Sequence, residues 1–343
     1  MPGPQSTFSG VDNRPRWVGT PCSGAGNVGG CVTRINAEPG NVVTVNYVLK
    51  NQNVGRSWVA SGNLMKTLSN GLAVRGAYSY GRSQNTVDAG STASGTFNGI
   101  AQFTNPNNPG LGYSQNSPGK RAFISATYSK QWLGIGATTV SAFWEARTNS
   151  NNFATNGSYV FAGDMNGDSV SNNDLIYVPK DKSEMNFAQF TGSNGHVYTV
   201  DEQQNAFEAY ILQDPYLSKN RGRYAERNAT FLPVVKRIDL SLAQGVFHGR
   251  AGRRHSGEVR LDITNFGNLV NSKWGAGQRF LIPSTSSSLN LIPILTNATA
   301  DATGKVSYRM AVVNNTLPTT TFQTTTFSSD VYVMMVSFRY NFN

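Results

Sequence analysis

The sequence predicts an all-β fold: an antiparallel segment of a transmembrane β-barrel with long extracellular loops. Three observations lead to this prediction. The C-terminal residues alternate between apolar and polar side chains, and no apolar run is long enough for a membrane-spanning helix. The expected strands are also joined by short turns on one side and by long loops on the other. Strands with one apolar face and one polar face cross a bilayer when they form a barrel.

Residues 331–342 carry the clearest alternation. A period of two places successive side chains on opposite faces of a strand. One face holds Tyr332, Met334, Val336, Phe338, Tyr340 and Phe342, and the other holds Ser337, Arg339, Asn341 and Asn343. Aromatic residues crowd the chain end, where a membrane strand would meet the water interface. An amphipathic strand of a soluble β-sandwich is the alternative interpretation.

The composition agrees with alternating strands and polar loops. Of the 343 residues, 38% are hydrophobic and 14% are charged, and the mean hydropathy is −0.34. A spanning helix would need about 18 consecutive apolar residues, which the chain lacks. The net charge of +10 would suit anionic lipid headgroups or nucleic acid. Because no dense Lys/Arg run is interleaved with aromatic residues, we expect no nucleic-acid partner.

Six further segments show the same alternation. Their apolar faces are Trp58, Ala60, Leu64 and Leu68; Leu72, Val74, Tyr78 and Tyr80; Ala122, Ile124, Ala126 and Tyr128; Val140, Ala142, Trp144 and Ala146; Ile238, Leu240, Leu242 and Val246; and Val259, Leu261 and Ile263. With the C-terminal segment they make about seven strands, roughly 9–13 residues long. We expect interfacial aromatic girdles, with core packing as the alternative, from Trp58, Tyr78, Tyr80, Tyr128, Trp144, Phe338, Tyr340 and Phe342.

The connections between these strands alternate in length. Short links occur at 69–71, where Asn-Gly is a strong hairpin signal, at 133–134 and at 248–257. Long polar stretches separate the hairpins. If the C-terminus is periplasmic, all short links are periplasmic and all long loops are extracellular, as in outer-membrane barrels. We expect the arginines of the third link to be solvated: Arg250, Arg253 and Arg254.

This pattern divides the chain into four regions. Residues 1–56 form an extracellular loop region, which includes the alternating segment 42–49, and residues 57–148 form two hairpins. Residues 149–235 form a long extracellular loop with a short helix, and residues 236–343 hold the final strands. Seven strands leave open edges, and each unpaired backbone group in lipid costs several kcal/mol. We therefore expect the remaining strands to come from upstream sequence.

The N-terminal region supports the same expectation. MPGPQSTFSGVDNRPRW has no basic segment followed by an apolar one, so it is not a secretory signal. We expect either a mature sequence or the C-terminal piece of a longer protein. Cys22 and Cys31 lie in a Gly-rich stretch, which suggests a disulfide in an oxidising compartment. A two-Cys metal site would need further ligands, and the three histidines are distant in sequence.

Four stretches resemble TonB-dependent outer-membrane receptors, particularly the Oar-like subgroup. They are GDMNGDSVSNNDLIYVP (163–179), FEAYILQDPYLSKNRGRYAERN (207–228), LDITNFGNLVNSKWG (261–275) and the closing strand. The resemblance implies a 22-stranded barrel with a plugged lumen in the Gram-negative cell outer membrane, of which this chain is the C-terminal part.

The resemblance also implies partners. These are outer-membrane lipid, the barrel-assembly machinery, an unknown ligand taken up across the membrane, and a TonB system reached through N-terminal parts not seen here. In this family the closing aromatic strand is part of the assembly signal, which would include Tyr332, Phe338, Tyr340 and Phe342. One Asn follows Phe342, which departs slightly from the family pattern.

An Asp/Asn-rich loop is the one candidate metal site. Asp164, Asn166 and Asp168 stand at positions 1, 3 and 5 of a calcium-type loop, and Asp174 follows at position 11. Position 6 is Ser169 rather than Gly, and the closing acid falls one residue early. A turn stabilised by its own side chains is the alternative interpretation. A structural calcium ion is thus the only cofactor that the sequence suggests.

The long loop contains two more features. Residues 202–213 have helical periodicity through Phe207, Tyr210 and Ile211, and Pro215 ends the pattern. We expect this helix to pack within the outer loop, with partner binding as the alternative. The sequence RGRYAERN offers ion pairs that fix the loop, or ligand contacts, through Arg221, Arg223, Glu226 and Arg227.

The sequence favours a non-enzymatic role. It contains no nucleophile elbow, no zinc-protease motif and no Walker loop. We expect part of a transport barrel with surface loops that capture ligand. A surface adhesion or carbohydrate-binding β protein is the alternative, and solubility without detergent would distinguish it.

Overall fold

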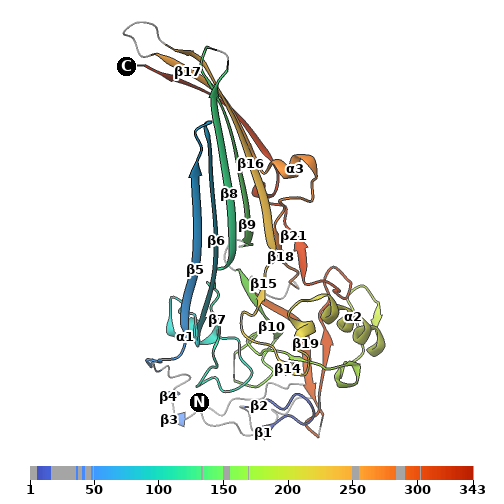
Figure 1. Cartoon of the computed structure of the whole chain (residues 1–343). Coiled ribbons are helices and arrows are strands. Elements are labelled where there is room, and N and C mark those ends of the chain that lie inside the picture. The colour runs from blue at the N-terminus through green and yellow to red at the C-terminus, as the bar shows by residue number, and fades with distance from the viewer. Residues whose placement is uncertain are drawn as a thin grey trace.

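The computed structural model describes residues 6–16, 36–37, 41–42, 48, 50–132, 134–149, 155–168, 170–248, 255–282, 290–301 and 303–342. The chain is mostly β-sheet. A long sheet rises from a globular body, and the C-terminal strand ends at the far end of the sheet (Figure 1). The expected disulfide of Cys22 and Cys31, the three turn arginines and most of segment 42–49 lie outside the described residues.

Seven long strands form the sheet as an antiparallel meander. They are β5 (Arg56–Thr67), β6 (Leu72–Asn85), β8 (Gly119–Gln131), β9 (Ala137–Thr148), β16 (Val234–His248), β17 (Ser256–Thr264) and β22 (Val333–Asn341). Their order across the sheet is their order in the sequence, and the short β7 (Gly112–Tyr113) pairs with the end of β6. These are the seven strands that the alternation predicted, so this part of the prediction is confirmed.

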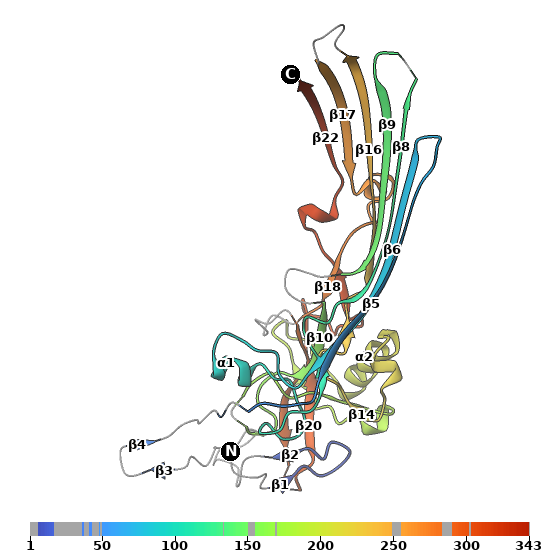
Figure 2. The same cartoon turned by 60° about the vertical axis from the view of Figure 1, so that its left-hand side comes forward.

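The short and the long strand connections lie at opposite ends of the sheet. At the far end the register pairs Thr67 with Ala73, Gln131 with Ala137 and His248 with Ser256, so each hairpin closes there. The long connections all return to the body (Figures 1 and 2). The predicted asymmetry between short turns and long loops is therefore confirmed. At Gly71 the short turn has φ +90°, and an added Cβ would lie 2.3 Å from the carbonyl oxygen of Ser129, so only glycine fits.

The register places the apolar residues predicted for the seven strands on one face. One transverse row, followed through the ladder partners, consists of Leu72, Tyr128, Val140, Leu242, Leu261 and Val336. The adjacent row on the opposite face contains Thr127, Ser141, Ser241 and Asp262. A one-residue slip would exchange the two faces, so the alternating pattern fixes the pairing.

The body is built from three separate parts of the chain. Its four-stranded sheet has the order β15 (Thr230–Phe231), β10 (Asn156–Phe161), β19 (Leu291–Ala300) and β20 (Val306–Met310). The pairing of β10 with β19 is parallel, unlike the meander. Residues 155–232 and 276–330, with the N-terminal segment 6–16, share one hydrophobic core that includes Phe8, Tyr159 and Ile292. Region 236–343 thus contains body elements besides the final strands.

Short elements complete the body and its edges. They are β1 (Ser6–Thr7), β2 (Pro15–Arg16), β3 (Asn36–Ala37), β4 (Asn41–Val42), α1 (Ala93–Asn98), β11 (Tyr177–Val178), η1 (Lys182–Glu184), β12 (Phe190–Thr191), β13 (Val197–Tyr198), η2 (Leu217–Lys219), β14 (Arg223–Tyr224), α3 (Phe266–Val270), β18 (Gln278–Phe280), β21 (Phe322–Thr324) and η3 (Ser328–Asp330).

The predicted helix is present as α2 (Val200–Gln213). Thr199 caps it, since its Oγ1 accepts a hydrogen bond from the Glu202 amide at 3.2 Å. Phe207, Tyr210 and Ile211 are fully buried in the body, which confirms the expected packing face. Among the described residues, no helix is long and apolar enough to cross a membrane.

The burial of α2 gives a direct test of the body core. Phe207→Ala should destabilise the body by about 3–5 kcal/mol, because it removes a fully buried aromatic ring and leaves a cavity. The control is Leu212→Ala on the same helix, where the side chain is 63% exposed. That change should stay within about 0.5 kcal/mol. Denaturant unfolding followed by near-ultraviolet circular dichroism would measure both, and equal losses would contradict this packing of α2.

Candidate functional site

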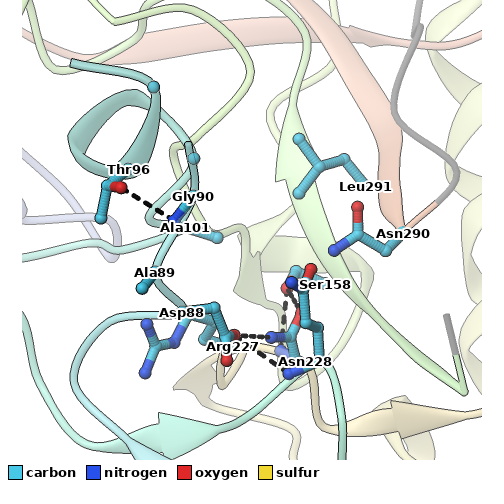
Figure 3. A pocket seen from close by; sticks show the side chains of 13 residues that line it. Asp88, Ala89, Gly90, Thr96, Ala101, Ser158, Arg227, Asn228, Asn290 and Leu291 are labelled. Carbon is cyan, nitrogen blue, oxygen red and sulfur yellow. Dashed lines mark hydrogen bonds between the residues drawn. The ribbon is translucent and has the colours of Figure 1, made fainter. Parts of the chain in front are cut away.

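A polar pocket lies where three loop segments of the body meet (Figure 3). It has a volume of about 200 Å³. Residues 88–101 form one wall, Arg227 and Asn228 form the floor, and Ser158 and Leu291 come from the parallel strands β10 and β19. The glycines at 90, 95 and 99 keep the first wall free of bulky side chains.

Asp88 is the acceptor at the centre of this pocket's hydrogen-bond network. Its Oδ1 accepts from the Asn85 amide group at 2.8 Å and from the Ser114 hydroxyl at 2.7 Å. Its Oδ2 accepts from the Gln115 backbone at 3.0 Å and from Asn228 Nδ2 at 3.2 Å. Four donors on one carboxylate join the loop after β6 to the long loop before β16.

Arg227 and Asn228 complete the network. The Arg227 guanidinium donates to the backbone oxygens of Asn85 and Thr86, the latter at 2.7 Å. Burial lowers the pKa of Arg227, and the nearby charge of Asp88 opposes this effect. Asn228 has φ 54°, a left-handed conformation that Asn tolerates, and its backbone N–H donates to Ser158 Oγ at 2.8 Å. The polar groups at the floor thus hold the loops together.

The Asp/Asn loop is buried, but its carboxylates do not converge. Asp164 Oδ1 accepts from the Gly167 amide at 2.7 Å, and Asp168 Oδ1 accepts from the Val170 amide at 2.9 Å. Asp174 Oδ2 accepts from the Met165 amide at 2.7 Å. Within the described ranges, no three His, Cys, Asp or Glu side chains lie close enough to hold a metal ion. Three members of the predicted set, Asp164, Asp168 and Asp174, thus accept backbone N–H groups of the loop itself.

Arg14 ties the N-terminal segment to this loop. Its guanidinium donates to Asp12 Oδ2 at 2.8 Å and to the Leu175 carbonyl at 2.7 Å, and it lies 3.5 Å from Asp174 Oδ1. Burial raises the pKa of Asp174 to about 7, and Arg14 limits that rise. Burial also raises the pKa of Asp168. No sequence pattern pointed to the link between Arg14 and this loop, because Asp174 and Leu175 are distant from it in the chain.

Arg221 of the sequence RGRYAERN forms its ion pair with an acid outside this sequence rather than with Glu226. Arg221 forms a two-pronged ion pair with Glu208 on α2, at 2.6 and 3.2 Å. Glu226 contributes its backbone N–H, which donates to the Tyr216 hydroxyl at 2.6 Å. Arg221 thus pairs with an acid outside this sequence and ties the loop to α2, which precedes it.

The polar face of the meander carries its own ion pairs. Arg121 Nε lies 2.8 Å from Glu145 Oε1, and Arg147 lies 3.4 Å from the same carboxylate. Arg260 Nε lies 2.8 Å from Asp262 Oδ1 on β17. Arg75 and Arg121 both lie over the ring of Phe123, with guanidinium–centroid distances of 5.7 and 5.9 Å. Charged groups thus occur on this face both near the body and toward the far end of the sheet.

The predicted interfacial aromatics lie on the apolar face and cluster toward its two ends. Trp58 and Tyr80 contact edge to face at the body end, with centroids 5.4 Å apart. At the far end Tyr340 stacks on Phe342 at 5.9 Å. Trp144 lies mid-strand instead, in the row of Ile124 and Ile238.

Comparisons with protein-family models, curated proteins and solved structures find no match.

The Asp88 network yields a stability prediction. Asp88→Asn replaces an oxygen that accepts hydrogen bonds with an NH₂ group that faces donors, so we expect a loss of about 1–3 kcal/mol. The control is Asp201→Asn, since Asp201 is exposed at the start of α2 and contacts Asn205 Nδ2. Hydrogen exchange should accelerate in residues 85–118 of the Asp88 variant alone. Unchanged exchange there would contradict the role of Asp88.

Proposed function

We propose that this chain is a seven-strand segment of an outer-membrane β-barrel of the TonB-dependent, Oar-like type. The meander would cross the membrane, and the body would stand outside as the folded surface loops that meet ligand. The segment would take part in ligand uptake without enzymatic activity. The apolar stretches of neighbouring strands together form a band across the sheet. The observation that carries the proposal is that this band lies diagonal to the strands.

The apolar face of the meander is broad and exposed. Leu64 is 78% exposed, Ile124 51% and Val336 73%, although they lie on the first, third and last strands. An apolar surface that spans a whole sheet exceeds what a soluble monomer leaves uncovered. Lipid is a cover that suits this area and agrees with the strand lengths, since a tilted membrane strand needs about 9–11 residues.

Basic residues bound this apolar face at the same spacing on two strands. Four consecutive positions of the face separate Arg56 from Lys66 on β5 and Lys120 from Lys130 on β8. On β17 the four positions of the face run from Gly257, after His255, to Ile263 at the end of the strand. The bounded stretches have the length that membrane strands require.

The apolar stretches of β5, β8 and β17 lie at different levels along the sheet. On β5 the midpoint of the stretch is Ser61. Its ladder partner on β6 pairs in turn with Arg121 of β8, so Ser61 and Arg121 lie at the same level. On β8 itself the midpoint is Ser125. On β17 it is Arg260, level with Ser129 of β8. The band therefore moves along the strands by about 26 Å while it crosses about 24 Å of sheet.

This slope is the tilt of the strands against a level band. Equal displacement along and across the strands corresponds to a tilt of about 45°, which is the tilt of membrane strands in barrels. In a soluble two-layer sandwich nothing requires the apolar stretches of all strands to lie at one common level, as a bilayer does. The diagonal course thus favours the membrane over a soluble adhesion or carbohydrate-binding protein.

Both edges of the meander are open among the described residues. β5 pairs only with β6, and β22 pairs only with β17. Unpaired backbone groups in lipid are costly, so the barrel would be completed by strands from outside these residues. The charged face described above would then line the lumen, and its arginines would meet the ligand on its path.

A pair of arginine substitutions on β8 tests the lipid face. Ile124→Arg, near the midpoint of the band, should cost roughly 2–4 kcal/mol in bilayers. Thr127→Arg is the matched control, since Thr127 is exposed on the opposite face of the same strand. It should cost less than about 1 kcal/mol. Urea titrations of folding into lipid vesicles would measure both. Equal costs would show that the apolar face does not meet lipid.

The location of the native product tests the function more broadly. An antibody against residues 184–230 should detect it in the outer-membrane fraction, and detergent should be required to release it. A product that is soluble without detergent would contradict the barrel and favour the adhesion or carbohydrate-binding alternative. Removal of the TonB system should abolish uptake of whichever ligand the receptor carries.

A further inference from the structure

Asp168 is a buried carboxylate that is surrounded by side-chain amides from two loops. Its side chain is fully buried. Three amide nitrogens face its Oδ2: Gln102 Nε2 at 3.4 Å, Asn166 Nδ2 at 3.4 Å and Asn173 Nδ2 at 3.5 Å. Hydrogen bonds to a carboxylate are normally 2.7–2.9 Å long. Since Oδ1 accepts from the Val170 amide at 2.9 Å, Oδ2 is the oxygen of this carboxylate that is poorly satisfied.

Two of these amides also carry oxygens without partners. Gln102 Oε1 and Asn173 Oδ1 are buried and accept no hydrogen bond. The two residues are 5% and 2% exposed, so water does not supply the missing donors freely. An unsatisfied buried acceptor costs about 1–3 kcal/mol, and here two occur beside the same carboxylate. In this orientation the nitrogen of each amide makes only a long hydrogen bond, and its oxygen accepts none.

Rotation of these amides by 180° exchanges nitrogen and oxygen with little change of shape. Gln102 Oε1 and Asn173 Oδ1 would then stand about 3.4–3.5 Å from Asp168 Oδ2. Oxygen ligands of calcium lie 2.3–2.6 Å from the ion, so neighbouring ligands at right angles are roughly 3.3–3.7 Å apart. The distances of the two amide oxygens from Asp168 Oδ2 would then lie in the range found between neighbouring calcium ligands.

We propose that Asp168, Gln102 and Asn173 bind a calcium ion through their side-chain oxygens. Backbone carbonyls and water would supply the remaining ligands. Calcium suits this site better than magnesium, because it accepts irregular sets of neutral oxygens and magnesium demands octahedral geometry. The proposal differs from the loop motif read in the sequence, since it takes Gln102 from another loop and Asn173 in place of Asp164 and Asp174.

The site would join two outer loops. Gln102 belongs to the loop between β6 and β8, whereas Asp168 and Asn173 belong to the long loop before β16. Backbone bonds already align them: Gln102 N–H donates to the Asn173 carbonyl at 2.8 Å, and Leu175 N–H donates to the Gln102 carbonyl at 2.9 Å. With a single carboxylate ligand we expect a Kd of about 0.1–1 mM, the range of extracellular calcium modules.

Calcium titration of the whole chain tests the proposal. The chain would be freed of divalent ions, in detergent or in buffer alone, whichever keeps it monodisperse. Isothermal titration should then show one calcium ion bound in the range given above and weaker binding of magnesium. Since the readout is binding, it does not depend on membrane insertion. No calcium binding up to roughly 10 mM, well above the expected Kd, would overturn the proposal.

Two substitutions identify the ligands. Asp168→Asn should abolish binding, whereas Asp301→Asn, in an exposed turn of similar form, should leave it unchanged. Gln102→Glu separates the two roles of the amide. If its oxygen binds the ion, the added charge should tighten calcium binding about tenfold or more. If its nitrogen only donates to Asp168, the same change should leave the calcium Kd unimproved, which would overturn the assignment of Gln102.

Discussion

The alternation of side chains in register across seven strands is the constraint on which the rest of the structure depends. Because the side-chain period is two, a single slip would carry a whole strand's apolar set to the charged face. The ladder pairs Ile238 with Trp144 and Trp144 with Ile124, so each apolar residue supports the next across the sheet. In the proposed barrel the same register sets the level of the membrane, since the apolar band is diagonal to the strands and horizontal to the bilayer.

The body obeys a different principle, in which buried polar groups connect segments that are distant in sequence. Asp88 gathers donors from two loops, and Arg14 reaches from the N-terminal segment to the Leu175 carbonyl. Arg237 of β16 donates to Asp330 Oδ1 at 3.0 Å, which fixes the body onto the polar face of the meander. Such contacts hold long loops in one arrangement without a large sheet, and a folded ligand-binding surface requires that arrangement.

The meander could be predicted from the sequence because its signal is local: alternation within a strand and Gly-containing turns such as 69–71. Helix α2 was predictable for the same reason, through Phe207, Tyr210, Ile211 and the stop at Pro215. The body was not, since the parallel pairing of β10 with β19 joins segments with no shared pattern. The spacing of Asp164, Asn166 and Asp168 pointed to the loop for which we propose calcium binding. It could not reveal Gln102, which reaches Asp168 from another connection.

The most direct test of the central claim is the depth of each strand in a lipid bilayer. Single cysteines with a fluorescent label, placed in a chain with Cys22 and Cys31 replaced by Ser, would be read by depth-dependent lipid quenchers along β5, β8 and β17. The account predicts quenching at alternate residues. On each strand the strongest quenching should occur at the apolar-face residues next to Ser61, Ser125 and Arg260. Maxima at ladder-aligned residues instead, or no alternation at all, would contradict a tilted membrane sheet.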